Sequence, residues 1–337
     1  MIIVMKNKST KQDVEKVIDI LKQHDLDANL STGSQATIVG VLGDKAKLGN
    51  FDFELLDCVE KCVPIMHPYK LASHEMYPEG RTVKVGDEII GGKKLVMMAG
   101  PCAVENEDQI MKAAIGVKDA GARFLRGGAY KPRTSPYSFQ GMEEDGLKLM
   151  RKAADATGLK VVSEIVAADQ IDICAKYCDM LQIGARNMQN FRLLREVGRS
   201  KVPVLLKRGI SSTIEEWLDA AEYIMSEGNY NVVLCERGIR TFETATRNTL
   251  DVSAVPVVKE RSSLPIIVDP SHASGKSRYI LPLSLAGIAA GADGLIIEVH
   301  PNPEQALSDA AQQLTPKVYA DLFKKVGNVA EAVGRTM

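Results

Sequence analysis

From Lys94 onward, a short apolar segment followed by a helix-like segment occurs eight times along the chain. The apolar segments are Leu95–Ala99, Ala122–Leu125, Lys160–Ser163, Met180–Ile183, Val202–Leu206, Asn231–Cys235, Pro265–Val268 and Gly294–Ile297. Strands that alternate with helices form parallel sheets. Eight such units in about 245 residues match the size of a closed (β/α)8 TIM barrel better than an open sheet. No GxGxxG follows the first strand, which counts against a dinucleotide-binding fold.

Amphipathic segments between these strands predict the helices of the barrel. They lie at 107–120, 143–157, 168–177, 189–198, 214–226, 243–250, 278–290 and 316–333. The stretch from Ser253 to Lys259 is apolar and fits none of them, so we interpret it as an extra strand-like segment.

Residues 1–66 have a different pattern, which predicts a small N-terminal domain. The order is strand (Ile2–Met5), helix (Lys11–His24), strand (Ala28–Ser31), strand (Ala36–Leu42), helix (Phe51–Cys62) and strand (Val63–His67). This βαββαβ order is the ferredoxin-like unit. The domain carries no cluster of catalytic residue types, so a packing or oligomerisation module and a regulatory domain both remain open.

A linker rich in Pro, Gly and charged residues is predicted at 67–93, between this domain and a catalytic barrel at 94–337. Within it, Val83–Val85 and Glu88–Ile90 flank Gly86-Asp87, which predicts a short hairpin.

Composition excludes several classes of protein. A net charge of −1 and a pI of 6.6 argue against nucleic-acid or membrane-surface binding. No apolar run approaches the roughly 20 residues of a membrane-spanning helix, and Met1–Met5 is too short for a signal peptide core. The cysteines lack zinc-ligand spacing, so we expect reduced thiols and a cytoplasmic protein. They are Cys58, Cys62, Cys102, Cys174, Cys178 and Cys235.

Polar residues follow all eight predicted strands, and the chemistry of barrel enzymes lies at these C-terminal strand ends. Six cations converge there, which implies a polyanionic ligand rather than surface ion pairs. They are Arg126, Lys131, Arg133, Arg186, Lys207 and Arg237. Gly127-Gly128 and Thr134-Ser135 would add close backbone approach and hydroxyl donors for phosphate. Lys207 and Arg208 alternate along one strand, and we predict that Lys207 faces the barrel axis.

A second group of strand-end residues has the chemistry of metal ligands. Cys102, His272, Glu298 and Asp309 follow strands 1, 7 and 8, which are neighbours in a closed barrel. Mixed sulfur, nitrogen and oxygen ligation suits Mn²⁺, Fe²⁺, Co²⁺ or Zn²⁺. Unrelated polar strand ends are the alternative interpretation, and His300 is a competing ligand.

Several of these motifs resemble the type I 3-deoxy-D-arabino-heptulosonate 7-phosphate (DAHP) synthases that carry an N-terminal ferredoxin-like regulatory domain. The motifs are AGPC (99–102), LRGGAYKPRTSPYSFQG (125–141), QIGARNMQNF (182–191), LLKRG (205–209), CERGIRTFE (235–243), VDPSH (268–272) and EVHPNP (298–303). The KPRTS segment separates this family from the synthase that acts on arabinose 5-phosphate, in which an asparagine precedes the Arg-Ser pair.

The resemblance implies a metal-dependent condensation of phosphoenolpyruvate with erythrose 4-phosphate, the first step of the shikimate pathway. It implies that Arg126, Lys131, Arg186, Lys207 and Arg237 hold phosphoenolpyruvate. The phosphate of erythrose 4-phosphate would be bound by Arg133, Thr134 and Ser135. One divalent metal ion would be bound by Cys102, His272, Glu298 and Asp309. We expect Lys131 to act as an acid near the aldehyde, Glu164 and Lys207 to position a water, and Asp309 to exchange a proton.

Three other functions remain open at this point. They are a 3-deoxy-D-manno-octulosonate 8-phosphate synthase using arabinose 5-phosphate, a Schiff-base aldolase using Lys207 or Lys131, and a non-catalytic sensor. The resemblance also implies feedback inhibition by tyrosine or phenylalanine through residues 1–66, and a homotetramer. Neither the physiological metal nor the inhibiting amino acid follows from the sequence.

Overall fold

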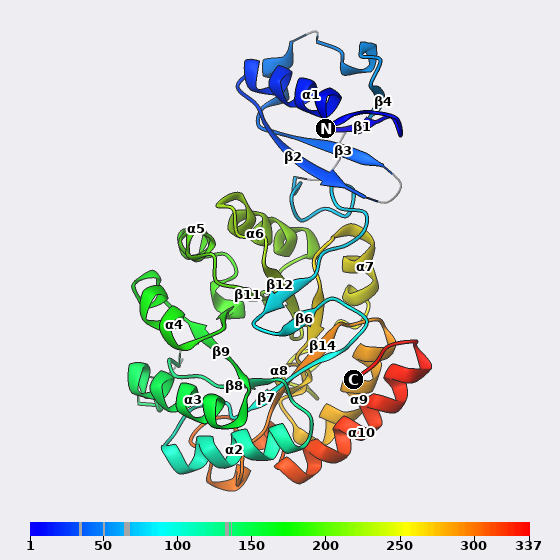
Figure 1. Ribbon diagram of the computed structural model, residues 1–337. Helices are drawn as coiled ribbons and strands as arrows, with labels where there is room; N and C mark the ends of the chain where they lie inside the picture. Colours follow the sequence, from blue (N-terminus) through cyan, green and yellow to red (C-terminus); the bar gives the residue numbers. More distant parts are fainter. Residues whose placement is uncertain (34–35, 50, 64–67, 132–134, 136) are drawn as a thin grey trace. The chain divides into compact units, whose positions relative to one another are not determined.

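The computed structural model describes residues 1–33, 36–49, 51–63, 68–131, 135 and 137–337. The chain divides into two compact units, which we describe separately. The first contains residues 1–81 together with 261–263, and the second contains residues 82–260 and 264–337. Figure 1 shows a small sheet with one long helix in the first unit and a ring of helices around a barrel in the second.

An antiparallel sheet of order β2-β3-β1-β4 forms the centre of the first unit. The strands are β1 (Ile2–Met5), β2 (Asp27–Thr32), β3 (Thr37–Leu42) and β4 (Val59–Val63). Helix α1 (Lys11–Gln23) begins with a capping box between Thr10 and Asp13 and buries Val14, Val17 and Leu21. These elements and their order confirm the predicted ferredoxin-like class.

The predicted helix over Phe51–Cys62 is wrong. The structure has the 3-10 helices η1 (Lys45–Leu48) and η2 (Phe53–Leu55), after which β4 pairs with β1. The apolar residues of this stretch recur at the spacing of an amphipathic helix. Its end is nevertheless a strand, because the free edge of β1 provides hydrogen-bond partners for the backbone of β4. Most of the predicted strand Val63–His67 lies outside the described residues.

The opposite face of this sheet is covered by the segment that follows it, which we had predicted as part of a linker. Tyr69 and Met76 are fully buried. The sulfur of Met76 lies so close to Gly40 on β3 that any side chain at this position would clash with it. Tyr77 donates a hydrogen bond from its hydroxyl to the side chain of Asn29 on β2. Residues 69–77 are therefore part of the first unit.

Eight parallel strands close into a barrel in the second unit, in the order β10-β11-β12-β13-β14-β7-β8-β9, which confirms the predicted fold class. The strands are β7 (Val96–Gly100), β8 (Phe124–Arg126), β9 (Lys160–Ile165), β10 (Met180–Ile183), β11 (Val204–Lys207), β12 (Val232–Glu236), β13 (Ile266–Val268) and β14 (Gly294–Glu298). The helices are α2 (Glu107–Asp119), α3 (Glu143–Thr157), α4 (Ile171–Tyr177), α5 (Phe191–Ser200), α6 (Ile214–Ser226), α7 (Ala254–Arg261), α8 (Pro270–Ser274), α9 (Ile280–Ala289) and α10 (Pro316–Ala332).

The predicted hairpin is present as β5 (Val83–Val85) and β6 (Glu88–Ile90). Its apolar side chains Val83, Val85 and Ile90 are buried in one cluster with the inward-facing residues of the barrel strands. The hairpin is thus part of the barrel core rather than a linker.

The predicted helix at 243–250 is also wrong, because this stretch is a loop held by other contacts. Ile239 and Thr249 exchange backbone hydrogen bonds of 2.9 Å, and the Glu243 carboxylate accepts from two backbone amides. Four threonines in 241–249 disfavour helix as well. The helix between β12 and β13 is α7 (Ala254–Arg261). It covers most of the apolar segment from Ser253 to Lys259, so the interpretation of this segment as strand-like is wrong.

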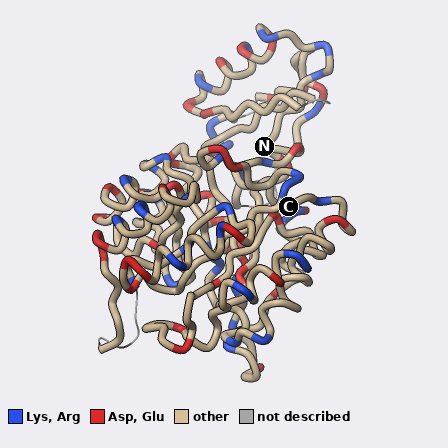
Figure 2. Tube along the Cα trace, turned by 60° about the horizontal axis from the view of Figure 1, so that its bottom comes forward, with Lys and Arg blue, Asp and Glu red and all other residues tan. Residues whose placement is uncertain are grey.

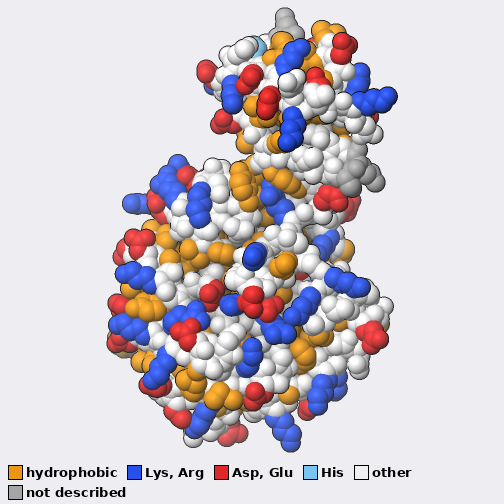
Figure 3. All heavy atoms as spheres, in the orientation of Figure 1, with side chains coloured by type: hydrophobic (Ala, Val, Ile, Leu, Met, Phe, Trp, Pro, Cys, Tyr) orange, Lys and Arg blue, Asp and Glu red, His pale blue; other side chains and the backbone are white. Residues whose placement is uncertain are grey.

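Basic and acidic residues both occur along the helices of the barrel (Figure 2). They are mixed on the face of the barrel that Figure 3 shows. Among the described residues, no helix is both long and apolar enough to cross a membrane.

Candidate active site and metal centre

On seven of the eight strands, the last apolar side chain that faces into the barrel is followed, two residues later, by a polar one. Alternate residues of a strand face the same side, so a residue two positions beyond a core side chain also points into the barrel. The apolar core residues include Phe124, Val162, Met180, Leu205, Cys235, Ile267 and Ile296. Two positions after them lie Arg126, Glu164, Gln182, Lys207, Arg237, Asp269 and Glu298. This simple alternation builds the site.

A cavity of about 400 Å³ opens at these strand ends. Six cations line it: Lys131, Arg186, Lys207, Arg237, Arg240 and Arg247. Its acidic lining residues are Glu164 and Asp309, and its other lining residues include Ser135, Asn248 and His272. Of the predicted site residues, Arg133 and Thr134 lie outside the described part of the chain. The excess of cations gives the cavity a positive electrostatic potential, which favours anions.

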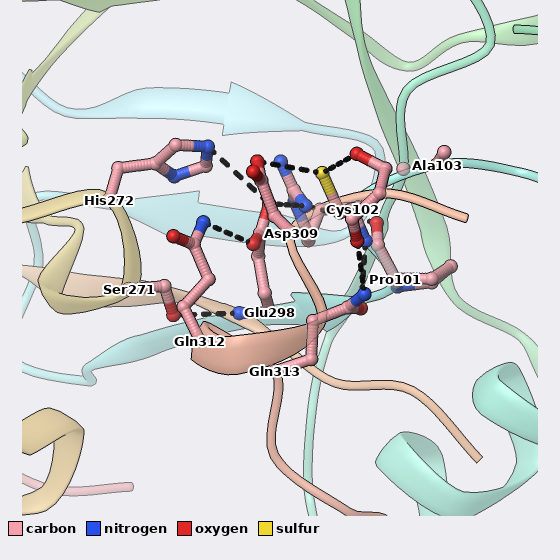
Figure 4. A network of polar contacts seen from close by, with 12 residues as sticks. Pro101, Cys102, Ala103, Ser271, His272, Glu298, Asp309, Gln312 and Gln313 are labelled. Atoms are coloured by element: carbon pink, nitrogen blue, oxygen red, sulfur yellow. Dashed lines mark hydrogen bonds and ion pairs between the residues drawn. The ribbon is translucent and has the colours of Figure 1, made fainter. Parts of the chain in front are cut away.

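Three of the four predicted metal ligands form a compact group. One ligand atom from each of Cys102, Glu298 and Asp309 lies within 4.8 Å of the other two. His272 is outside this group among the described residues, yet its Nε2 lies 3.4 Å from Oε1 of Glu298. Figure 4 shows the four side chains converging. A thiol, two carboxylates and an imidazole suit a borderline divalent metal ion.

Glu298 is buried and remains ionised. Burial favours its neutral form, but His272 and Arg126 outweigh this effect and lower the pKa to about 2. Arg126 Nη1 lies 2.8 Å from Oε1, and Gln312 Nε2 donates to Oε2 at 2.6 Å. Nε of Arg126 is buried with no hydrogen-bond partner among the described residues. Arg126 is not among the residues that line the cavity, in contrast to the other described cations of the predicted set.

His272 is oriented by Asp269, a residue to which the sequence analysis gave no role. Its Nδ1 lies 2.7 Å from Oδ2 of Asp269, which also pairs with the ammonium of Lys207. Burial favours a neutral Asp269, but His272 and Lys207 hold its pKa well below the ordinary value. Burial also lowers the pKa of His272. A neutral imidazole whose Nδ1 donates to a carboxylate presents Nε2 as a free metal ligand.

Cys102 is a buried thiol near the start of the loop after β7. Burial and the nearby carboxylate of Glu298 raise its pKa to about 12. Lys131 Nζ lies 3.1 Å from Sγ and 3.0 Å from the carbonyl oxygen of the same residue. Asp309 Oδ2 lies 3.3 Å from Sγ. A divalent cation would favour the thiolate that this environment otherwise disfavours.

Glu164 extends into the cavity beside β10. Its Oε2 accepts a hydrogen bond of 3.3 Å from Nε2 of Gln182. Its Oε1 occupies the space that a side chain at Gly184 would fill, so only glycine fits there. The carboxylate is therefore fixed on the wall of the anion cavity.

The structure distinguishes Lys207 from Arg208, and His300 from the proposed metal ligands. Lys207 faces the cavity, as predicted, whereas Arg208 points outward and pairs with Glu236 and Asp251. His300, the competing ligand, points to Glu105 at 3.4 Å and is absent from the metal-ligand group among the described residues.

Arg240 and Arg247 were missed by the sequence analysis. Both belong to the loop after β12, and the wrongly predicted helix at 243–250 concealed Arg247. Arg240 lies in the CERGIRTFE motif, three residues after Arg237. The signal that could have identified Arg247 is the unfavourable helix composition around it, which indicates a loop at a strand end.

Comparisons with known proteins agree with this geometry. Residues 73–334 match the DAHP synthetase I family, and residues 1–67 match the DAHP synthase ferredoxin-like domain. A phospho-2-dehydro-3-deoxyheptonate aldolase of Thermotoga maritima is 49% identical over 334 residues, 99% of each chain. A 2-dehydro-3-deoxyphosphooctonate aldolase of Geobacter sulfurreducens is 30% identical over 268 residues, 73% of this chain and 96% of that protein.

Solved structures show the same relationship. The crystal structure of the Thermotoga maritima DAHP synthase matches with a TM-score of 0.79 at 48% identity, over 99% of this chain and 98% of that chain. A truncated form of 3-deoxy-D-arabino-heptulosonate 7-phosphate synthase from this organism matches with a TM-score of 0.75 at 48% identity, over 80% of this chain and 98% of its own. These matches confirm the resemblance that the motifs indicated and the assignment of the chain to a family of enzymes. The chain belongs to the DAHP synthetase I family, with the ferredoxin-like domain at its N-terminus.

Proposed function

We propose that this chain condenses phosphoenolpyruvate with erythrose 4-phosphate, giving DAHP and inorganic phosphate, the first step of the shikimate pathway. The observation that carries the proposal is a cavity lined by six cations beside a group of thiol and carboxylate ligands, in a member of this family. The two substrates together carry about five negative charges at neutral pH. The cationic cavity can offset this charge.

Phosphoenolpyruvate would be held by Arg126, Lys131, Arg186, Lys207 and Arg237. The buried Nε of Arg126 supports this role, because it has no hydrogen-bond partner among the described residues. Arg237 supports it as well, since its buried guanidinium forms no ion pair within the described part of the chain. Arginine forks match carboxylate and phosphate oxygens, while lysine supplies a point charge.

Erythrose 4-phosphate would place its phosphate at Arg133, Thr134 and Ser135. Ser135 lines the cavity, whereas the other two residues lie outside the described part of the chain. Arg240 lines the same cavity and would add a further cation for the second phosphate.

One divalent ion of Mn, Fe, Co or Zn would be held by Cys102, His272, Glu298 and Asp309. The donor set and the oriented Nε2 of His272 fit such an ion. When bound, the ion would act as a Lewis acid that polarises the aldehyde of erythrose 4-phosphate. This chemistry prepares the aldehyde carbon for attack by C3 of phosphoenolpyruvate.

Proton transfers would be carried out by residues around this group. Lys131, whose ammonium lies beside Cys102, would donate to the alkoxide that forms from the aldehyde. Glu164 and Lys207 would position the water that adds to C2, and the resulting hemiketal phosphate would collapse with cleavage of its C–O bond. Asp309 would hold metal and exchange a proton, since it lies in a turn beside the cavity.

The choice of aldose phosphate tests the proposal. Phosphate release from phosphoenolpyruvate should be fast with erythrose 4-phosphate and at least about 100-fold slower with arabinose 5-phosphate, which corresponds to about 3 kcal/mol of discrimination. Comparable or greater release with arabinose 5-phosphate would favour the octulosonate synthase, the function of the 30% identical relative.

A Schiff-base aldolase would need a neutral lysine amine as its nucleophile. Lys207 is instead buried in an ion pair with Asp269. Borohydride added during turnover should therefore leave the mass of the protein unchanged. An adduct on Lys207 or Lys131 would replace the proposed chemistry with covalent catalysis.

The N-terminal domain would act as a feedback module for tyrosine or phenylalanine in a homotetramer. The match of residues 1–67 to the family's ferredoxin-like domain supports this role, and the solved truncated relative supports a barrel that folds without it. A chain that lacks residues 1–66 should retain activity and lose inhibition by both amino acids. Inhibition that survives the truncation would disprove this role, and sedimentation of the full chain as a species other than a tetramer would disprove the assembly.

A further inference from the structure

Gln312 joins the metal-ligand group to the loop after β12. Its side chain is buried and lies at the end of the 3-10 helix η7 (Ala310–Gln312). Nε2 donates to Oε2 of Glu298 at 2.6 Å, and Oε1 accepts from Nη1 of Arg247 at 3.1 Å. Figure 4 shows the amide of Gln312 directed at the Glu298 carboxylate. Because both ends of the amide are bonded, its orientation is fixed.

Arg247 contacts the second carboxylate of the group as well. Its Nη1 lies 3.6 Å from Oδ1 of Asp309. One guanidinium thus faces Asp309 directly and Glu298 through the amide of Gln312. Two carboxylates and a thiol within 4.8 Å of one another repel when ionised, and a neighbouring cation reduces this repulsion.

The backbone around Arg247 is held against His272, the fourth proposed ligand. Arg247 N donates to the carbonyl of Ser274 at 3.0 Å, and Asn248 Nδ2 donates to the carbonyl of His272 at 3.0 Å. A side chain at Gly275 would lie 2.7 Å from Cβ of Arg247, so glycine permits this close approach. The guanidinium is therefore presented from a loop that is tied to α8.

We propose that Arg247 and Gln312 are positioning residues of the metal centre. Gln312 holds the Glu298 carboxylate in its ligand orientation, and Arg247 fixes the amide of Gln312 and the carboxylate of Asp309. This inference rests on the proposed metal centre. It gives Arg247 a role that other cations lining the cavity do not share, because Arg240 contacts neither Gln312 nor Asp309 among the described residues.

The test is a titration of the full-length, metal-stripped protein with Co²⁺ alone, followed through the thiolate-to-cobalt absorption that reports Cys102. Gln312→Met and Arg247→Met should each weaken Co²⁺ binding about 10- to 100-fold, the usual effect of losing an outer partner of a metal ligand. Arg247→Lys keeps the charge and should recover part of the loss. Arg240→Met is the matched control and should bind Co²⁺ as the unchanged protein does.

Each outcome has one meaning. Wild-type affinity in both Gln312→Met and Arg247→Met overturns the positioning role and leaves the metal centre intact. An equal loss in Arg240→Met also overturns it, because general cavity charge would then be the cause. If the unchanged protein shows no thiolate–cobalt absorption, the metal centre and this inference fall together. Arg247 is partly exposed, so its variants keep the test valid even if Gln312→Met unfolds.

Discussion

The two halves of the cavity differ in how their charges are balanced. On the metal-centre side each reactive group already has a protein partner: Glu298 pairs with Arg126, His272 with Asp269, and Cys102 with Lys131. Elsewhere in the cavity, Arg237 and Arg240 form no ion pair within the described part of the chain. The first half is therefore preorganised by the fold, whereas the second awaits charge from its ligands.

This difference separates two kinds of mutational effect. A buried charge that loses its partner destabilises the protein, since the remaining charge is left uncompensated in the interior. A cavity cation that has no protein partner should contribute to ligand affinity and little to folding.

Glu298→Gln should damage both stability and activity. It leaves the buried guanidinium of Arg126 without its carboxylate, which we expect to cost about 3–5 kcal/mol of unfolding free energy. Urea unfolding measures this loss. Glu227→Gln is a control, because Glu227 pairs with Arg195 and Arg199 on the surface and should be replaceable with little change. Wild-type stability of Glu298→Gln would show that the metal half is not preorganised.

Lys131→Met should lower kcat about 10²- to 10⁴-fold, the usual contribution of a general acid. Its partner Cys102 is a neutral thiol, so stability should change less than in Glu298→Gln. Steady-state rates with saturating substrates measure the effect. A kcat within about tenfold of the unchanged protein would remove Lys131 from the mechanism.

Arg237→Met should act on affinity alone. We expect KM for phosphoenolpyruvate to rise about 10- to 100-fold, the effect of losing a charge-assisted hydrogen bond of about 1.5–3 kcal/mol. The midpoint of urea unfolding and the affinity for Co²⁺ should stay unchanged. A large loss of stability would show that Arg237 has a structural partner and would weaken the contrast between the halves.

The affinity for metal should rise with pH. Between pH 6 and 8 the Cys102 thiol, with a pKa of about 12, is protonated in the metal-free protein, while Glu298, with a pKa of about 2, is ionised. Burial lowers the pKa of His272 below its ordinary value, so its imidazole is neutral in the upper part of this range. Binding then releases one proton, so affinity should increase about tenfold per pH unit. Cobalt titrations at several pH values measure this slope, and Cys102→Ala should abolish it.

Much of this site could be predicted because strand alternation is a local property. Four site residues each lie two positions after an apolar core residue of the same strand: Arg126, Lys207, Arg237 and Glu298. The errors occur where distant contacts decide the local structure. The end of the helix-like stretch 51–62 is part of β4 because it pairs with β1, and the pairing of Ile239 with Thr249 holds 243–250 as a loop.

The partners of the site residues were harder to predict than the residues themselves. Asp269 follows the same alternation after Ile267, yet its bonds to Lys207 and His272 appear only in three dimensions. Arg247 and Gln312 are 65 positions apart, and no spacing rule brings them together. A sequence pattern can thus indicate which side chains reach the cavity, whereas their pairing depends on the tertiary structure.

A divalent metal held beside Cys102, Glu298 and Asp309 is proposed to act on substrates bound by the cavity cations. Phosphate release from phosphoenolpyruvate and erythrose 4-phosphate should be measured with metal-stripped protein, before and after the addition of one equivalent of Mn²⁺. We expect no turnover by the stripped protein and nearly full recovery with one equivalent. Full activity in protein shown by elemental analysis to be free of metal would contradict this proposal.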